Sequence, residues 1–249
     1  MKWEARELSG HLPIYMRGPS EDHGPLPAFI YFALSGEESL HLDPFNQPIQ
    51  FLENLPLRCY SFTLPFHGSE YDNNQAMERW ATEFIRHPLF LEEFLKNCLD
   101  NIQYLINQGW IDPNKIAVGG LSRGGFAATH LAAREPLIQT IVGFAPMTKL
   151  MSLEELKIAD PSWDLSQLIP KLIDKKIRFY MGNRDLRVNT RACFDFIYQL
   201  ANEAYHQGYR SPPVELILSP SVGFKGHGTL PPIFKAGAEW ISQQLLTST

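Results

Sequence analysis

The sequence predicts an α/β protein with a doubly wound, mostly parallel β-sheet flanked by helices, and two observations support this fold class. Short apolar runs rich in Ile, Val, Phe and Tyr recur along the chain with little charge inside them, which is typical of strands buried on both faces. Patterns with helical spacing lie between these runs, and alternating strands and helices imply right-handed crossovers between parallel strands. The predicted strands are residues 29–34, 58–64, 115–119, 140–144, 177–182 and 214–218.

The predicted helices rest on apolar residues that recur every three or four positions. Gly109 and Gly208 follow two of these patterns and are expected helix stops, and Pro88 separates two neighbouring helices. The opening residues 3–17 are expected to form an antiparallel hairpin at the edge of the sheet. The helices are predicted over residues 76–86, 94–107, 191–207 and 233–245.

Residues 148–172 follow the fourth predicted strand and are too long a stretch for a simple connection. We expect them to form a small helical insertion that lies like a cap over the strand ends. Its apolar residues Leu150, Met151, Leu156 and Trp163 would then wall a substrate cavity and bind acyl or alkyl groups. The alternative is a peripheral helix pair that does not contact the site.

Length and composition restrict the possible functions. The 249 residues are enough for a single domain spanning 1–249, and the formal net charge of −5 without a Lys/Arg cluster argues against nucleic-acid binding. No stretch is long and apolar enough for a membrane span, and the first residues do not resemble a secretory signal. Cys59, Cys98 and Cys193 are few and far apart, so we expect reduced thiols in a cytoplasmic protein without a membrane partner.

The most informative motif is a G-x-S-x-G sequence centred on Ser122. It follows the predicted strand 115–119 and precedes a good helix-forming segment, which is the strand–turn–helix context that a nucleophilic serine of this kind requires. Side chains at Gly120 and Gly124 would collide in such a tight turn. The following helix would direct its N-terminal amides, and its partial positive charge, at the serine. We therefore predict that Ser122 is a catalytic nucleophile.

A serine nucleophile needs a base, and the base needs a third group that orients it. Asp185 follows the predicted strand 177–182 and is the expected acid. Asp160 and Asp164 are rivals, but they belong to the insertion. Asp174 precedes the strand and would lie at the opposite end of the sheet.

The expected base is His227, which lies in the loop after the last predicted strand. Its neighbours Gly226 and Gly228 would let this loop fold close to the serine. His206 precedes that strand, and His130 lies two turns into the helix after Ser122, so neither is well placed.

The remaining requirement is a pair of donors for the oxyanion. One is the backbone N–H of Arg123, and the other is the N–H of Leu34, or of Ser35 if the register slips by one residue. Ser35, Met151 and Trp163 are the predicted substrate contacts. The Arg123 side chain either binds an anionic group of the substrate or forms a salt bridge with a loop carboxylate; we expect the apolar wall to dominate.

Together these residues resemble the α/β-hydrolase superfamily from residue 29 to the end of the chain. The elbow at 120–125, with its doubled glycine, is similar to those of the prolyl-oligopeptidase-like and dienelactone-hydrolase-like branches. The sequence at 65–68 resembles the Pro-x-His-Gly turn common after the fourth strand, where His67 is expected to stabilise its own turn. The chain departs from the usual His-Gly-x-x-Gly oxyanion loop, since Phe32 and Ala33 replace the histidine and the first glycine.

The resemblance implies a serine hydrolase that cleaves carboxylic ester or thioester bonds of a small-molecule substrate through an acyl-enzyme. It implies no organic cofactor, and the histidines lack metal-ligand spacing. Two alternatives stay open. One is hydrolysis of small peptides or amides, or acyl transfer to an acceptor other than water. The other is a catalytically silent binding protein of the same fold.

Overall fold

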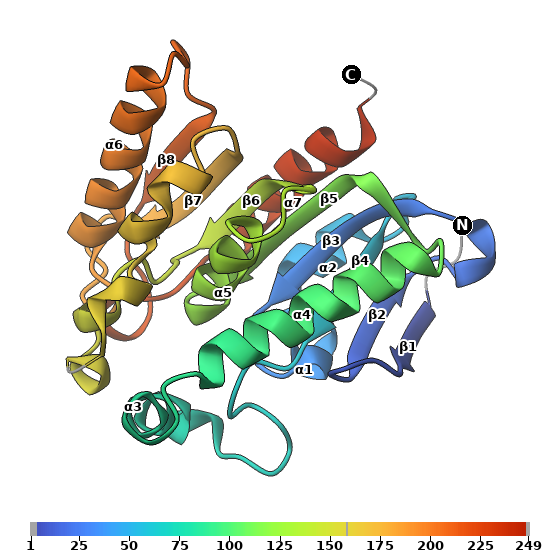
Figure 1. Ribbon diagram of the computed structural model, residues 1–249, viewed down its shortest axis with the longest axis horizontal. Coiled ribbons are helices and arrows are strands. Elements are labelled where there is room, and N and C mark those ends of the chain that lie inside the picture. Colours follow the sequence, from blue (N-terminus) through green and yellow to red (C-terminus); the bar gives the residue numbers. More distant parts are fainter. Residues whose placement is uncertain (1–3, 158, 248–249) are drawn as a thin grey trace.

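A computed structural model describes residues 4–157 and 159–247 of the chain. Its centre is an eight-stranded sheet with the order β1-β2-β4-β3-β5-β6-β7-β8. The strands β3 to β8 are parallel, whereas β1 and β2 form an antiparallel hairpin that adds to β4. Figure 1 shows this hairpin at one end of the sheet and β8 at the other. The predicted fold class is confirmed, and so is the edge hairpin, apart from residue 3, which lies outside the described residues.

The strands agree closely with the runs expected from the sequence. The longest, β5, reaches Leu121 and leads directly into Ser122. Only β8 differs in kind, because it is an edge strand whose residues are partly exposed or exposed rather than buried on both faces. The strands are β1 Glu4–Leu8, β2 Ile14–Gly18, β3 Leu26–Phe32, β4 Arg58–Phe62, β5 Ile111–Leu121, β6 Ile138–Phe144, β7 Lys176–Gly182 and β8 Val214–Ser219.

Helices cover both faces of the sheet and bury a separate apolar cluster on each (Figure 1). The larger cluster lies under α3 Ala76–Arg86, α4 Phe90–Asn107, α5 Arg123–Ala132 and α6 Thr190–His206. The second lies under α1 Gly36–His41, α2 Gln47–Leu52 and α7 Pro231–Leu246. The short helices α1 and α2 were not expected from the sequence, because six residues are too few to show a helical apolar period.

The insertion at 148–172 contains short 3₁₀ turns rather than α-helices. They are η3 Leu150–Ser152, η4 Glu154–Leu156, η5 Pro161–Trp163 and η6 Leu165–Lys171. Leu150 and Leu156 are fully buried in the larger apolar cluster. The insertion therefore belongs to the core of the fold, and these two leucines cannot line a substrate cavity as the sequence suggested.

The sequence also led to expectations about the three cysteines and about membrane-spanning segments. Cys59, Cys98 and Cys193 are free and buried, and burial raises the pKa of each thiol. They pack as small apolar side chains. Within residues 4–157 and 159–247, none of the helices has both the length and the apolar character of a membrane-spanning helix.

Candidate active site

The candidate active site lies where the carboxyl ends of four parallel strands meet. The loops after β3, β5, β7 and β8 carry Leu34, Ser122, Asp185 and His227 respectively. The strand β3 lies between β4 and β5, so the connection from β3 to β4 and the connection from β5 to β6 run in opposite directions. Open α/β sheets bind their ligands in the crevice formed at such a switch point.

The turn at Ser122 has the strained backbone geometry expected of a nucleophile elbow. Ser122 has φ 55° and ψ −117°, a conformation that non-glycine residues adopt only where the surroundings enforce it. A Cβ atom on Gly120 would lie 2.2 Å from the carbonyl carbon of Gly124. A Cβ atom on Gly124 would lie 2.0 Å from the carbonyl oxygen of Phe32. Both glycines are therefore required, as the motif predicted.

Ser122, His227 and Asp185 form one hydrogen-bonded chain. The Ser122 Oγ is 2.9 Å from His227 Nε2, and His227 Nδ1 is 2.6 Å from Asp185 Oδ2. Because an ionised carboxylate only accepts hydrogen bonds, Nδ1 carries the proton of the neutral imidazole. Nε2 is then the acceptor for the Ser122 hydroxyl, which is the arrangement that general-base activation requires.

Asp185 is held in a single orientation by its own loop. Its side chain is fully buried. Oδ1 accepts hydrogen bonds from the backbone N–H groups of Arg187 at 2.8 Å and Val188 at 3.0 Å, which leaves Oδ2 for the histidine. The backbone N–H of Asp185 donates to Thr190 Oγ1 at 2.8 Å. The loop therefore fixes the direction in which the carboxylate points.

The loop that carries His227 is held against the Asp185 loop by close backbone contacts. Gly226 has φ +77°, and a Cβ atom there would lie 2.4 Å from the carbonyl oxygen of Arg184. The N–H of Leu186 donates to the Lys225 carbonyl at 2.8 Å. The glycine before His227 thus permits the approach that the sequence pattern indicated.

The rival residues lie elsewhere. Asp160 is an exposed N-cap of η5, and Asp174 is exposed before the start of β7. Asp164 is buried, but its Oδ1 accepts from the backbone N–H of Leu150. His206 is exposed at the end of α6.

Two other histidines are held neutral. His130 is buried, and its Nε2 donates to a backbone carbonyl at 3.0 Å while Nδ1 faces an Arg134 N–H at 3.0 Å. Burial, together with the Arg134 charge, lowers the pKa of His130 to about 3. His67 donates from Nδ1 to the carbonyl of Pro65 at 2.8 Å, which holds its own turn as expected. Burial and the nearby Arg123 charge lower its pKa to about 4.

The predicted oxyanion donors differ in their availability. Among the described residues, the Arg123 N–H at the start of α5 has no hydrogen-bond partner. The Leu34 N–H instead donates to Ser39 Oγ at 3.1 Å, and the Ser35 N–H donates to Glu38 Oε2 at 3.1 Å. Both of these acceptors belong to α1, and Ser35 and Glu38 form its capping box. Only the Arg123 N–H is therefore free to bind an oxyanion in this arrangement.

The cavity at Ser122 has a volume of about 220 Å³. Its wall is mostly apolar, and two arginines complete it. Of the insertion, only Leu153 contributes, so the insertion contacts the site but does not form the expected wall. The lining residues are Ala33, Leu34, Phe45, Met77, Leu121, Ser122, Arg123, Leu153, Arg187 and His227.

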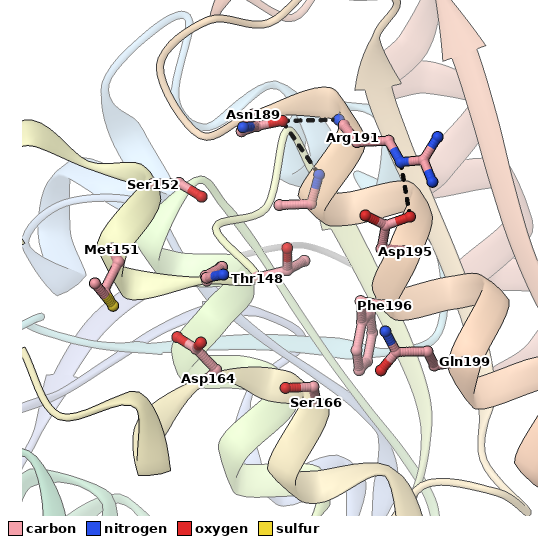
Figure 2. Close-up of a pocket in the computed structure, with 12 residues that line it drawn as sticks. Thr148, Met151, Ser152, Asp164, Ser166, Asn189, Arg191, Asp195, Phe196 and Gln199 are labelled. Carbon is pink, nitrogen blue, oxygen red and sulfur yellow. Dashed lines mark hydrogen bonds and ion pairs between the residues drawn. The ribbon is translucent and has the colours of Figure 1, made fainter. Parts of the chain in front are cut away.

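The three predicted substrate contacts lie outside this cavity, and that prediction needs correction. Ser35 caps α1 and lines a different surface pocket. Trp163 packs against the rings of His130 and Phe84, with centroid distances of 5.2 and 6.5 Å. Met151 borders a second, larger pocket between the insertion and the first turns of α6, which Figure 2 shows. The apolar character of Met151 and Trp163 did not indicate which of these environments each side chain would occupy.

The Arg123 side chain has no carboxylate partner among the described residues. The salt bridge that the sequence left open is therefore absent there. Arg187, which sequence reasoning missed, also lines the cavity and forms a two-pronged pair with Glu155 at 2.7 and 2.8 Å. Its position two residues after Asp185 was the one available signal. Phe45 and Met77 lie in segments without any motif.

A metal centre has no ready ligands in the described part of the chain. There, no three His, Cys, Asp or Glu side chains gather in a way that could hold a metal ion.

Comparisons with known proteins show what this chain is similar to. Residues 92–209 match the prolyl oligopeptidase family, a range that includes Ser122 and Asp185 but stops before His227. A stretch of 42 residues is 45% identical to acylamino-acid-releasing enzyme 2 of Oryza sativa subsp. japonica, which is 17% of this chain and 5% of that enzyme.

Solved structures show the same fold over the whole chain. TT1662 from Thermus thermophilus superposes with a TM-score of 0.70 at 17% identity and covers 100% of both chains. The acylaminoacyl peptidase of Pyrococcus horikoshii gives a TM-score of 0.70 at 14% identity, and this chain spans 43% of its length. The chain therefore has the α/β-hydrolase fold, and over residues 92–209, slightly less than half of its length, it is similar to the prolyl oligopeptidase family.

Proposed function

We propose that the protein hydrolyses carboxylic esters or thioesters of a small substrate, with Ser122 as nucleophile, His227 as base and Asp185 as orienting acid. The observation that carries this proposal is the unbroken chain of two hydrogen bonds, 2.9 and 2.6 Å long, from the Ser122 Oγ to the buried Asp185 carboxylate. Three loops that lie far apart in the sequence each contribute one residue to this chain of hydrogen bonds.

The reaction follows from this geometry. His227 Nε2 takes the hydroxyl proton as Ser122 Oγ attacks the carbonyl carbon, and Asp185 stabilises the imidazolium that forms. The imidazolium then gives its proton to the leaving alcohol or thiol, and an acyl-enzyme remains. Water, activated by the same histidine, attacks the acyl-enzyme, releases the acid and restores Ser122.

The oxyanion would bind at the N-terminus of α5. The Arg123 N–H points from the first turn of that helix, whose partial positive charge also favours an anion. The Leu34 N–H can contribute only if it exchanges Ser39 Oγ for the oxyanion. A single ready donor gives less transition-state stabilisation than two, which suits esters and thioesters better than the less reactive amides.

The size of the cavity supports a small substrate. Sites for drug-sized ligands usually have about 300–1,000 Å³. The cavity here, about 220 Å³, is smaller and would hold a short acyl group around the nucleophile.

A second candidate function is hydrolysis of small peptides or other amides. The family match and the similarity to an acylaminoacyl peptidase favour it. A direct comparison of 4-nitrophenyl esters with aminoacyl-naphthylamides separates the two candidates, and higher kcat/KM on an amide would make the peptidase the better description.

Labelling with a fluorophosphonate tests the common mechanism. The wild-type protein should be labelled covalently, and Ser122→Ala should abolish both labelling and turnover, with kcat lower by roughly three orders of magnitude or more. Ser211→Ala, which changes an exposed serine in the loop before β8, is the matched control and should label normally. Labelling that persists in Ser122→Ala, or no labelling of the folded wild type, would contradict the proposal.

A further inference from the structure

The wall of the cavity at Ser122 holds two cationic side chains. Arg123 and Arg187 line it, and no acidic side chain does. Glu155 neutralises Arg187 through both of its carboxylate oxygens. Arg123 makes no ion pair or side-chain hydrogen bond with any described residue.

Arg123 is only partly buried, so water can satisfy its N–H donors until a ligand displaces it. By contrast, the buried Arg58 guanidinium donates to four backbone carbonyls. Burial and the Arg187 charge lower the pKa of Arg123 to about 10, so the side chain stays charged at neutral pH. The Arg123 side chain thus has donors and a charge that no described residue pairs with, and a group entering the cavity can meet them.

The position of Arg123 restricts where that group would be. Arg123 directly follows Ser122, and both line one cavity of about 220 Å³. During the reaction the acyl group is bonded to Ser122 Oγ, so it is the part of the substrate that must remain beside Arg123. A planar guanidinium matches a carboxylate with two parallel hydrogen bonds.

We infer that the cavity selects substrates whose acyl group carries a second, free carboxylate, which Arg123 binds. The substrates are then half-esters or half-thioesters of short dicarboxylic acids, or amides with an acidic acyl residue. Arg187 supports this role, because both oxygens of Glu155 bond to Arg187 and neither pairs with Arg123. This inference rests on the proposed function for its catalytic part only.

The first test compares two esters with the same leaving group and nearly the same shape. 4-Nitrophenyl valerate and the 4-nitrophenyl half-ester of glutaric acid differ by a terminal methyl against a carboxylate. Rates with Ser122→Ala protein give the spontaneous hydrolysis to subtract. The half-ester should have the higher kcat/KM in the wild type, and Arg123→Met should lower the ratio of the two kcat/KM values at least tenfold.

Using this ratio removes any general loss of activity from the comparison. Arg123→Lys should retain part of the preference, since a charge remains without the two-pronged geometry. Arg187→Met should also lower the ratio, because it frees Glu155 to pair with Arg123. Arg184→Met is the control, since it removes the same charge from an exposed neighbour of Asp185 that does not line the cavity, and it should leave the ratio within about threefold.

Binding of glutarate to the Ser122→Ala protein tests recognition without catalysis. Calorimetry should show one site, with affinity at least tenfold weaker after Arg123→Met is added. If both esters are hydrolysed by Ser122 at equal rates, the carboxylate inference is wrong and the proposed function stands. If glutarate binds through Arg123 but neither ester is hydrolysed, the proposed function fails and the recognition site stands. Tighter binding of inorganic phosphate than of glutarate would overturn the assignment to carboxylates.

Discussion

Replacing Asp185 by Asn should trap His227 in the wrong tautomer. The amide keeps the shape of the carboxylate but has one acceptor and one donor end. In the wild type, Oδ1 accepts from the N–H groups of Arg187 and Val188, while Oδ2 accepts from His227. The asparagine oxygen therefore stays with the two backbone donors, and its NH₂ group faces His227 Nδ1. Nδ1 then loses its proton, Nε2 gains one, and Nε2 can no longer accept the Ser122 proton.

The structure sets the size of this effect. The opposite amide orientation would leave two buried N–H groups without acceptors, at about 1–3 kcal/mol each, or about 2–6 kcal/mol in total. The population with the productive tautomer falls accordingly, by roughly 30-fold to 10⁴-fold. We expect kcat for 4-nitrophenyl acetate to fall within that range, with an unchanged far-UV spectrum.

The matched control is Asp164→Asn. Asp164 is also buried and also accepts a backbone N–H, at 2.8 Å from Leu150, but lies away from the serine. Its variant should hydrolyse the ester at near-normal rates. An Asp185→Asn protein that is folded and within tenfold of wild-type activity would refute the tautomer explanation, as would an equal loss in Asp164→Asn.

Three other perturbations probe the surroundings of the site. Burial lowers the pKa of His130 to about 3 in the folded protein, so the contribution of this neutral histidine to stability is complete above pH 6.5 and is lost as pH falls towards 3. In urea unfolding, the free energy of unfolding should fall by about 1.4 kcal/mol per pH unit below 6.5. The slope should be shallower in His130→Gln. An unchanged slope in that variant would assign the effect to other groups. Gly120→Ala places a Cβ atom 2.2 Å from the Gly124 carbonyl carbon. The variant should be less stable by about 1–3 kcal/mol or more in thermal unfolding, and it should also lose ester hydrolysis. An unaltered Tm would show that the elbow relaxes. Ser39→Ala removes the acceptor for two buried backbone N–H groups after β3 and should destabilise by about 1–3 kcal/mol per unpaired donor, whereas stability equal to the wild type would mean that water replaces the hydroxyl.

The sequence predicted best the features that depend on local chemistry. A tight turn around Ser122 needs glycines at fixed positions, and a parallel sheet brings the loops after its strands to one edge wherever those strands lie in the chain. The sequence alone therefore predicted that Ser122, Asp185 and His227 lie together, and in the structure they form one hydrogen-bonded chain.

Features that depend on long-range packing could not be predicted in this way. Trp163 and Met151 are apolar residues of one insertion, yet the first packs on His130 in the core and the second borders a pocket beside α6. The Leu34 N–H was a reasonable oxyanion donor by position, but no pattern indicated that Ser39, in an unexpected six-residue helix, would accept its hydrogen bond.

The contact between Gly124 and Phe32 also explains why residue 32 can differ from the usual histidine. The atom that Gly124 must avoid is the Phe32 carbonyl oxygen, which every amino acid possesses. The Phe32 ring itself points into the core, 5.9 Å from Phe62 and 6.3 Å from Phe94 between ring centroids. Main-chain geometry thus positions the nucleophile against the neighbouring loop, and side chains at position 32 are selected by the packing beneath the sheet. Directed evolution of this protein could therefore vary residue 32 for stability while position 124 stays glycine.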